Sequence, residues 1–165
     1  MTVTNVVKDP RARTLTITAH FGAPIERVWR IWSDPRQLER WWGPPSFPAT
    51  VTEHDLVPGG TVAYSMTGPE GDVHHGRWDV RAVDPPRALE FEDGFADADG
   101  EPRPDLPTGL IRVALSELAG GRTQMVVTTT WASGEAMAQI LATGTDTGMT
   151  AAVDQIDALL ERRTP

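Results

Sequence analysis

Tyr64 and His75 have the clearest capacity for proton chemistry in this sequence. They lie on two expected strands that are joined by a turn at Gly68-Pro69-Glu70-Gly71. If that turn pairs Met66 with Val73, Tyr64 faces His75 and both side chains point to the same face of the sheet. A phenol beside an imidazole can orient a ligand or transfer a proton. The two residues are therefore weak candidates for a catalytic pair.

The second of these strands leaves another orientation open. Its apolar residues, including Trp78 and Val80, lie at even positions, whereas His75 lies at an odd one. His75 and these apolar residues can all point inward only if a β-bulge near Gly76 changes the alternation. The alternative is that His74 and His75 are both exposed to solvent. The sequence does not decide whether either histidine, His74 or His75, faces the cavity.

Other chemistry finds little support in the sequence. It has no cysteine, which excludes disulfides, thiolate nucleophiles and cysteine-ligated metals. Glu53-His54-Asp55 lacks metal-ligand spacing, because His54 points away from its neighbours if the segment is a strand. No glycine-rich phosphate loop, nucleophile elbow or paired histidine motif occurs. We therefore expect no metal, no cofactor and no covalent nucleophile.

The charge and hydropathy of the chain limit its partners. The formal net charge is -8, and Lys8 is the single lysine, so nucleic-acid binding is not expected. No apolar run approaches the ~20 residues that cross a bilayer, and Met1 to Pro10 does not resemble a secretory signal. These features favour a cytoplasmic protein without a membrane span.

The pattern of elements predicts an α+β fold. Thr14 to His20 alternates as a strand, and two short helices follow, the first beginning near Pro24 and the second running from Arg36 to Trp42. An amphipathic helix closes the chain, with an apolar stripe from Met149 to Leu160. Between them we expect six more strands, at 50–57, 62–66, 73–83, 89–95, 110–118 and 123–131. We therefore predict a single domain over residues 1–165, with its core at about 13–162, in which a seven-stranded antiparallel sheet wraps around a long C-terminal helix.

This arrangement predicts a cavity. A twisted sheet curls around a helix without touching it everywhere, and the space that remains suits a small molecule. Gly144 and Gly148 would lie on the sheet-facing side of the helix if it runs unbroken from Met137, and their missing side chains would open volume. Alternatively, the glycines mark a break between two helices. Both possibilities can hold together.

The candidate ligand-binding residues share an inward position on the strands or on the helix. Each of them can also be plain core. Trp42 and Phe47 could cover the mouth of the cavity, although the tryptophans can equally anchor the short helices to the sheet. The full set is Trp42, Phe47, Val62, Tyr64, Met66, His75, Phe91, Met125, Val127, Met137, Leu141, Gly144, Gly148 and Met149.

Several motifs in order resemble one known superfamily, over about residues 13–161. They are Ala23 to Trp29, Leu38 to Pro44, Pro58-Gly59-Gly60, Gly68 to Gly71, Asp84 to Arg87, and the helix from Gly144 to Leu160. The chain resembles the SRPBCC proteins, whose START-like helix-grip fold is shared by birch-pollen allergens and polyketide cyclases. More narrowly, it resembles the family named for the activator of the ninety-kilodalton heat-shock protein's ATPase.

The cavity, the Tyr64 and His75 pair and the resemblance leave three alternative functions. The first is binding of a small hydrophobic or aromatic ligand between sheet and helix. The second is a cyclase-like or hydrolase-like enzyme acting on such a molecule. The third, a co-chaperone or protein-interaction module, rests on the family name. The identity of the ligand and the choice between monomer and homodimer stay open.

Overall fold

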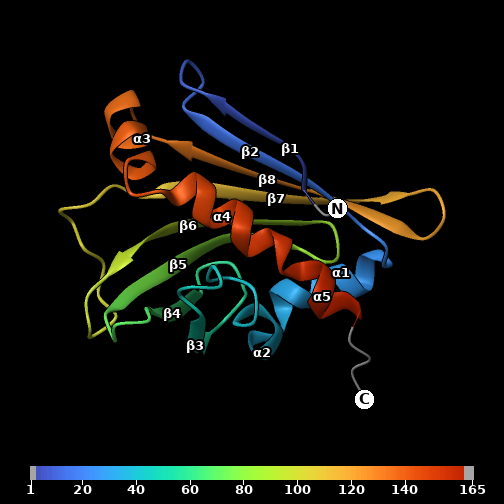
Figure 1. The fold of residues 1–165 in the computed structure, drawn as a ribbon, viewed down its shortest axis with the longest axis horizontal. Helices are drawn as coiled ribbons and strands as arrows, with labels where there is room; N and C mark the ends of the chain where they lie inside the picture. The colour runs from blue at the N-terminus through green and yellow to red at the C-terminus, as the bar shows by residue number, and fades with distance from the viewer. Residues whose placement is uncertain (1–2, 162–165) are drawn as a thin grey trace.

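The computed structural model describes residues 3–161, so residues 1–2 and 162–165 of the expected domain lie outside the described part. Its centre is one antiparallel sheet in the order β1-β2-β8-β7-β6-β5-β4-β3 (Figure 1). The strands are β1 (Val3–Asp9), β2 (Thr14–Phe21), β3 (Ala49–His54), β4 (Thr61–Thr67), β5 (Val73–Asp84), β6 (Ala88–Ala96), β7 (Gly109–Leu118) and β8 (Arg122–Trp131). The expected sheet wrapped around a C-terminal helix is confirmed.

The expected number of strands was wrong by one. The additional strand is β1, which pairs with β2 at the edge of the sheet. Its backbone completes a ladder, but Val6 and Val7 are both exposed and neighbouring in sequence. Because β1 buries almost no side chain, it lacks the alternation of polar and apolar residues by which the other strands are recognised.

The helices are shorter than the sequence suggests. They are α1 (Ile25–Ser33), α2 (Pro35–Leu38), α3 (Gly134–Leu141), α4 (Thr145–Asp154) and α5 (Ile156–Glu161). The long C-terminal helix is therefore three segments. The break between α3 and α4 lies at Gly144, whose φ of 84° is left-handed and favours glycine. In Figure 1, α4 and α5 cross the sheet while α3 lies beside the end of β8. No helix within residues 3–161 is long and apolar enough to span a membrane.

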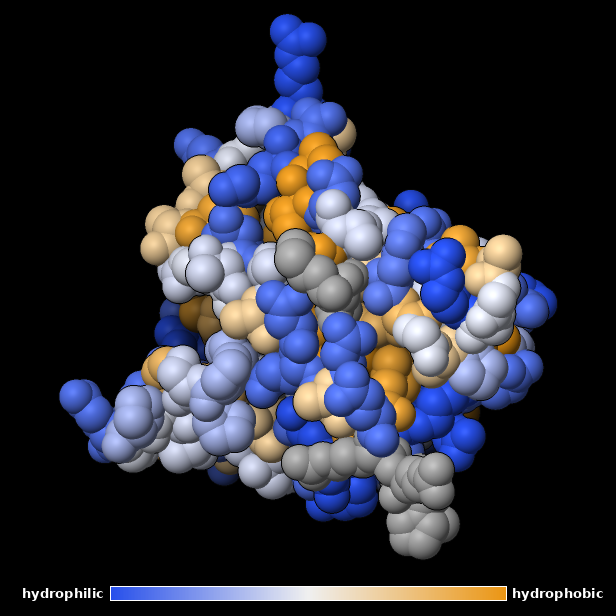
Figure 2. All heavy atoms as spheres, turned by 45° about the vertical axis from the view of Figure 1, so that its right-hand side comes forward, coloured by the Kyte–Doolittle hydropathy of each residue, from blue (hydrophilic) through white to orange (hydrophobic). Residues whose placement is uncertain are grey.

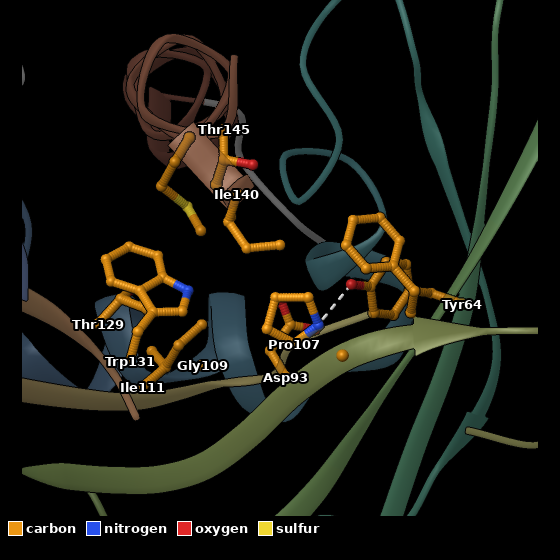
Figure 3. Close-up of a pocket in the computed structure, with 12 residues that line it drawn as sticks. Tyr64, Asp93, Pro107, Gly109, Ile111, Thr129, Trp131, Ile140 and Thr145 are labelled. Atoms are coloured by element: carbon orange, nitrogen blue, oxygen red, sulfur yellow. Dashed lines mark hydrogen bonds between the residues drawn. The ribbon is translucent and has the colours of Figure 1, made fainter. Parts of the chain in front are cut away.

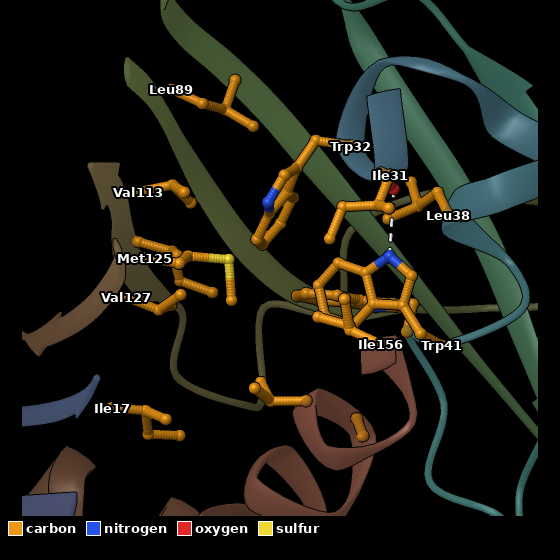
Figure 4. Close-up of a cluster of buried hydrophobic side chains, with 14 of the residues drawn as sticks. Ile17, Ile31, Trp32, Leu38, Trp41, Leu89, Val113, Met125, Val127 and Ile156 are labelled. Carbon is orange, nitrogen blue, oxygen red and sulfur yellow. Dashed lines mark hydrogen bonds between the residues drawn. The ribbon is translucent and has the colours of Figure 1, made fainter. Parts of the chain in front are cut away.

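Tryptophans of α1 and of the turn after α2 fill the core beside the sheet (Figure 4). Trp32 and Trp41 are fully buried, and their rings meet edge to face at 4.7 Å. The Trp41 indole Nε1 donates a hydrogen bond to the Ile31 carbonyl oxygen at 2.9 Å, so its polar end is satisfied. This packing agrees with the alternative in which tryptophans anchor the short helices.

Gln155 lies between α4 and α5 and holds this region to the loop that follows α2. Its side-chain Nε2 donates to the carbonyl oxygens of Trp41, at 3.2 Å, and of Gly43, at 2.7 Å. We expect Gln155→Glu to lower the free energy of unfolding by about 1–3 kcal/mol, because the carboxylate has no N–H and faces two carbonyl oxygens. Urea unfolding measures this loss. The same change at the exposed Gln139 is the control, and an equal effect at both positions would contradict the prediction.

Candidate functional site

A cavity of about 400 Å³, called the main chamber here, lies between the sheet and the connection from α3 to α4. Strands β4, β5 and β6 form one wall, and the segment from Thr143 to Met149 forms the other. Most of the surface is apolar. The lining residues are Trp42, Pro44, Phe47, Tyr64, Met66, His74, His75, Asp93, Phe95, Thr143, Gly144, Thr145, Gly148 and Met149.

Two glycines leave the helical wall of the main chamber open. A Cβ atom added at Gly144 or at Gly148 would meet no other heavy atom within 4 Å. Gly144 also supplies the left-handed backbone at the start of α4, whereas Gly148 lies within the helix. The sequence left open whether these glycines break the helix or widen the cavity. In the structure Gly144 does both.

Tyr64 and Asp93 form the polar centre of the site. Tyr64 on β4 pairs with Gly76 on β5, and its ring extends over Gly76 toward β6. There the Tyr64 hydroxyl donates a hydrogen bond to Asp93 Oδ1 at 2.8 Å, as Figure 3 shows. A side chain at position 76 would occupy the place of the ring, so the glycine makes this contact possible.

Both groups of this pair have displaced pKa values. Burial raises the pKa of Asp93 from 3.8 to about 7, and the hydrogen bond from Tyr64 opposes that rise. Burial also raises the pKa of Tyr64 well above its usual value, and the neighbouring carboxylate raises it further. Tyr64 is therefore a hydrogen-bond donor at neutral pH, while Asp93 can hold or release a proton there.

A second, smaller hollow of about 80 Å³, called the side chamber here, adjoins the main chamber. Figure 3 shows the residues that line it. The two share Tyr64, Asp93, Phe95, Thr145 and Met149 as lining residues. Asp93 thus faces both chambers. The other residues that line the side chamber are Gly94, Pro107, Gly109, Ile111, Thr129, Trp131 and Ile140.

The expected pairing of Tyr64 with His75 is wrong. The register joins Thr67 to Val73, so Met66 faces His74 and Tyr64 faces Gly76. The irregularity in β5 lies between Val80 and Ala82, against β6, and not near Gly76. The strand alternation therefore turns His74 to the face of Tyr64, although atoms of both histidines line the main chamber.

His74 lies at the mouth of the main chamber. Its side chain is 59% exposed, and its Nε2 is 3.2 Å from Asp72 Oδ2. Phe47 packs beside it, with 5.7 Å between the ring centroids. The interior partner of Tyr64 is therefore Asp93, which was not among the residues predicted from the sequence, and not His75. Among residues 3–161, no cluster of three or more His, Asp or Glu side chains has the arrangement of a metal site.

Known proteins share the sequence features and the fold of this chain. The family model of the activator of Hsp90 ATPase homolog 1-like proteins matches residues 22–161. The chain belongs to this family. Protein Ms6760 from Mycobacterium smegmatis is 49% identical, with a TM-score of 0.89 and 99% of both chains covered. A protein from Arthrobacter aurescens is 45% identical, with a TM-score of 0.93, over 99% of this chain and 94% of the other.

More distant members of the family show the same fold. The AHSA1 protein from Silicibacter pomeroyi is 20% identical, with a TM-score of 0.69, and the match covers 89% of this chain and 96% of the other. No curated protein matches the chain. The helix-grip fold and membership of the SRPBCC superfamily are therefore shown, and the function has to be argued from the site.

For this family member, the structure divides the expected ligand-binding residues into two groups. Those that line the main chamber are Trp42, Phe47, Tyr64, Met66, His75, Gly144, Gly148 and Met149. The others line neither chamber: Val62, Phe91, Met125, Val127 and Met137 are buried in the core, and Leu141 packs against it. They have the expected inward direction, but neighbouring side chains fill the space in front of them. Phe91, for example, stacks on Trp78 with 3.9 Å between the ring centroids.

Asp93 is the residue that sequence reasoning missed, and a signal for it exists. Leu89, Phe91 and Phe95 alternate along β6 as its apolar face, and position 93 belongs to the same face. An acid in that series is a buried carboxyl, which is uncommon without a functional or structural partner.

Gly76 offers a direct test of the Tyr64–Asp93 contact. In Gly76→Ala the new Cβ would overlap the Tyr64 ring and hydroxyl, so the ring must move and the hydrogen bond to Asp93 is lost. Because that hydrogen bond lowers the pKa of Asp93, we expect its pKa to rise above about 7. Carboxyl carbon NMR across a pH titration measures it. Gly22→Ala, where the added Cβ meets nothing within 4 Å, is the control. An unchanged Asp93 pKa in Gly76→Ala would refute the expectation.

Proposed function

We propose that this protein binds a small hydrophobic or aromatic molecule in the main chamber. The observation that carries the proposal is the chamber itself, with about 400 Å³ between β4–β6 and the Gly144–Met149 segment. An engineered apolar cavity of about 150 Å³ holds benzene, so this space can accept a body of two or three fused rings. Its walls include Trp42, Phe47 and Met149, whose flat or flexible side chains suit aromatic surfaces.

Membership of the SRPBCC superfamily supports this proposal, since these proteins often bind hydrophobic ligands. The test is a thermal-shift screen with naphthalene-sized and anthracene-sized aromatic probes, followed by titration of tryptophan fluorescence, to which Trp42 contributes. A probe present at a hundredfold excess over its Kd stabilises the folded state by about 2.7 kcal/mol, which raises Tm by roughly 5 °C or more. Failure of every apolar probe to raise Tm would count decisively against the binding function.

One observation favours a second function, an enzyme that moves protons on its ligand. Asp93, with a pKa of about 7, faces the chamber and is held by Tyr64, so a general base is present although His75 is not paired with Tyr64. The test uses 2-tetralone, an aromatic ketone with acidic protons, dissolved in D₂O. Wild-type protein should accelerate exchange of those protons, and Asp93→Asn should not. Equal exchange with and without wild-type protein would remove this function.

The co-chaperone alternative has the family name as its support. It would need a contiguous apolar surface for a protein partner. On the face shown in Figure 2, hydrophobic side chains lie in separate groups between hydrophilic ones. That face gives the alternative no further support.

A further inference from the structure

The side chamber owes its space to a glycine in the middle of a cross-strand row. Asp93 on β6 pairs with Gly109 on β7, and Gly109 pairs with Trp131 on β8. Adjacent strands lie about 4.8 Å apart, so Asp93 and Trp131 face each other across roughly 10 Å with no side chain between them. The hollow of about 80 Å³ lies above this row.

Trp131 brings an unused hydrogen-bond donor to this hollow. The residue is 2% exposed, and a Cβ added at Gly109 would lie 3.2 Å from its Nε1. The indole nitrogen thus lies over Gly109, and Figure 3 shows it on the side of the ring that faces the chamber. Among residues 3–161, the Trp41 indole donates to a carbonyl oxygen, whereas the Trp131 indole donates to no protein group. Because Trp131 lines the hollow, its N–H can donate to a ligand or a water molecule there.

Asp93 supplies an acceptor on the opposite side. Its Oδ1 accepts from the Tyr64 hydroxyl at 2.8 Å, and no hydrogen bond from residues 3–161 reaches its Oδ2. The free donor of Trp131 and the free oxygen of Asp93 therefore bound one small space. An atom that fits between them has to donate one hydrogen bond and accept another.

We infer that the side chamber binds the hydroxyl group of the ligand, a phenol or an alcohol, while the apolar body of that ligand fills the main chamber. This inference rests on the proposed binding function. The ligand O–H donates to Asp93 Oδ2, and its oxygen accepts from Trp131 Nε1. Because the side chamber has about half the volume of a cavity that holds benzene, it admits a head group or the edge of a ring rather than a second ring system.

Other head groups fit these partners less well. A carboxylate would lie against the Asp93 carboxyl and either repel it or force it to stay protonated. An ammonium would pair with Asp93 but could accept nothing from the Trp131 N–H. A hydroxyl alone combines a donor and an acceptor in a single atom of the required size.

Four probes with one shared body test the inference: naphthalene, 2-naphthol, 2-naphthoate and 2-naphthylamine, each measured by equilibrium dialysis. Binding of naphthalene tests the main chamber, and the ratio of Kd values tests the side chamber. We expect wild-type protein to bind 2-naphthol about tenfold more tightly than naphthalene, as hydrogen bonds to the Trp131 N–H and to the Asp93 carboxylate allow. The naphthoate and the naphthylamine should bind more weakly than 2-naphthol.

The variant Trp131→Phe keeps a ring but removes the donor. It should weaken 2-naphthol severalfold and leave naphthalene unchanged, whereas Trp29→Phe, at a tryptophan that lines neither chamber, should change neither. As a measurement on wild-type protein, the indole N–H signal of Trp131 in an NMR spectrum should move with 2-naphthol and not with naphthalene. A Kd ratio near one, tighter binding of the acid or the amine, or an unmoved Trp131 signal would overturn the inference while naphthalene still binds. If no probe binds at all, both the proposed binding function and this inference are wrong.

Discussion

Replacing Asp93 with asparagine is expected to stabilise the protein by about 2–4 kcal/mol above pH 7. The carboxyl has a pKa of about 7 in the folded protein and about 3.8 in the unfolded chain. Each unit of difference corresponds to about 1.4 kcal/mol, so the shift of roughly three units sets the upper figure. Asparagine has no charge to bury, and its Oδ1 can still accept the hydrogen bond from Tyr64.

The sign of the pH dependence follows from proton binding. Between pH 4 and 7 the folded protein holds a proton on Asp93 that the unfolded chain has released. The contribution of Asp93 to the free energy of unfolding of the wild type therefore falls as pH rises through this window. The Asp93→Asn variant has no such loss, because asparagine binds no proton in this range. Because the two proteins share every other titratable group, the difference between the two curves isolates Asp93.

Urea unfolding at pH 4, 5, 6, 7 and 8 measures this difference. It should be near zero at pH 4 and reach its full value at pH 8. Asp99→Asn, an exposed change of the same charge, is the control and should give a flat difference. A flat difference for Asp93→Asn as well would show that the carboxyl is ionised in the folded protein without any penalty.

The fold was predictable because turns and alternation occur in a specific order along the chain. The strands β2 and β5–β8 bury alternate residues, which is the pattern that identifies a strand with one covered face. Strand β1 was not predicted, because its side chains are almost all exposed and only its backbone pairing with β2 defines it. Sequence patterns report burial and do not report backbone pairing.

The orientation of the histidines depended on a single residue of register. The turn predicted from the sequence pairs Met66 with Val73, whereas the structure pairs Thr67 with Val73 and leaves Gly68 to Asp72 in the turn. A shift by one residue moves every side chain of a strand to the other face. His74 therefore took the direction that was expected of His75.

The extent of the cavity was beyond sequence reasoning. Alternation shows that Val62 and Tyr64 both point inward, but it does not show what stands in front of them. Val62 is covered completely, opposite Trp78 on β5, whereas Tyr64 lines the main chamber even though the Trp42 ring packs edge to face on it. Gly144 and Gly148 gave the useful signal, since missing side chains on the sheet-facing side of this segment mark the open part of the wall.

Gly148→Leu is expected to weaken binding of an aromatic probe such as naphthalene by about tenfold or more. Gly148 lies inside α4, and its missing side chain borders the main chamber. A leucine there projects into space that the ligand needs, and overfilling a packed site costs about 1–3 kcal/mol. The chamber should shrink without any change in the sheet.

The stability of the same variant should move in the opposite direction. Glycine inside a helix costs about 1 kcal/mol relative to leucine or alanine, and a Cβ at position 148 meets no atom within 4 Å. The folded protein without ligand should therefore unfold at an equal or higher urea concentration while its probe binding falls. Gly134→Leu, at the exposed start of α3, is the matched control and should leave the Kd unchanged. Weaker binding together with lower stability would indicate a distorted helix, and unchanged binding would place the ligand elsewhere, whereas opposite movements of the two quantities locate it beside Gly148.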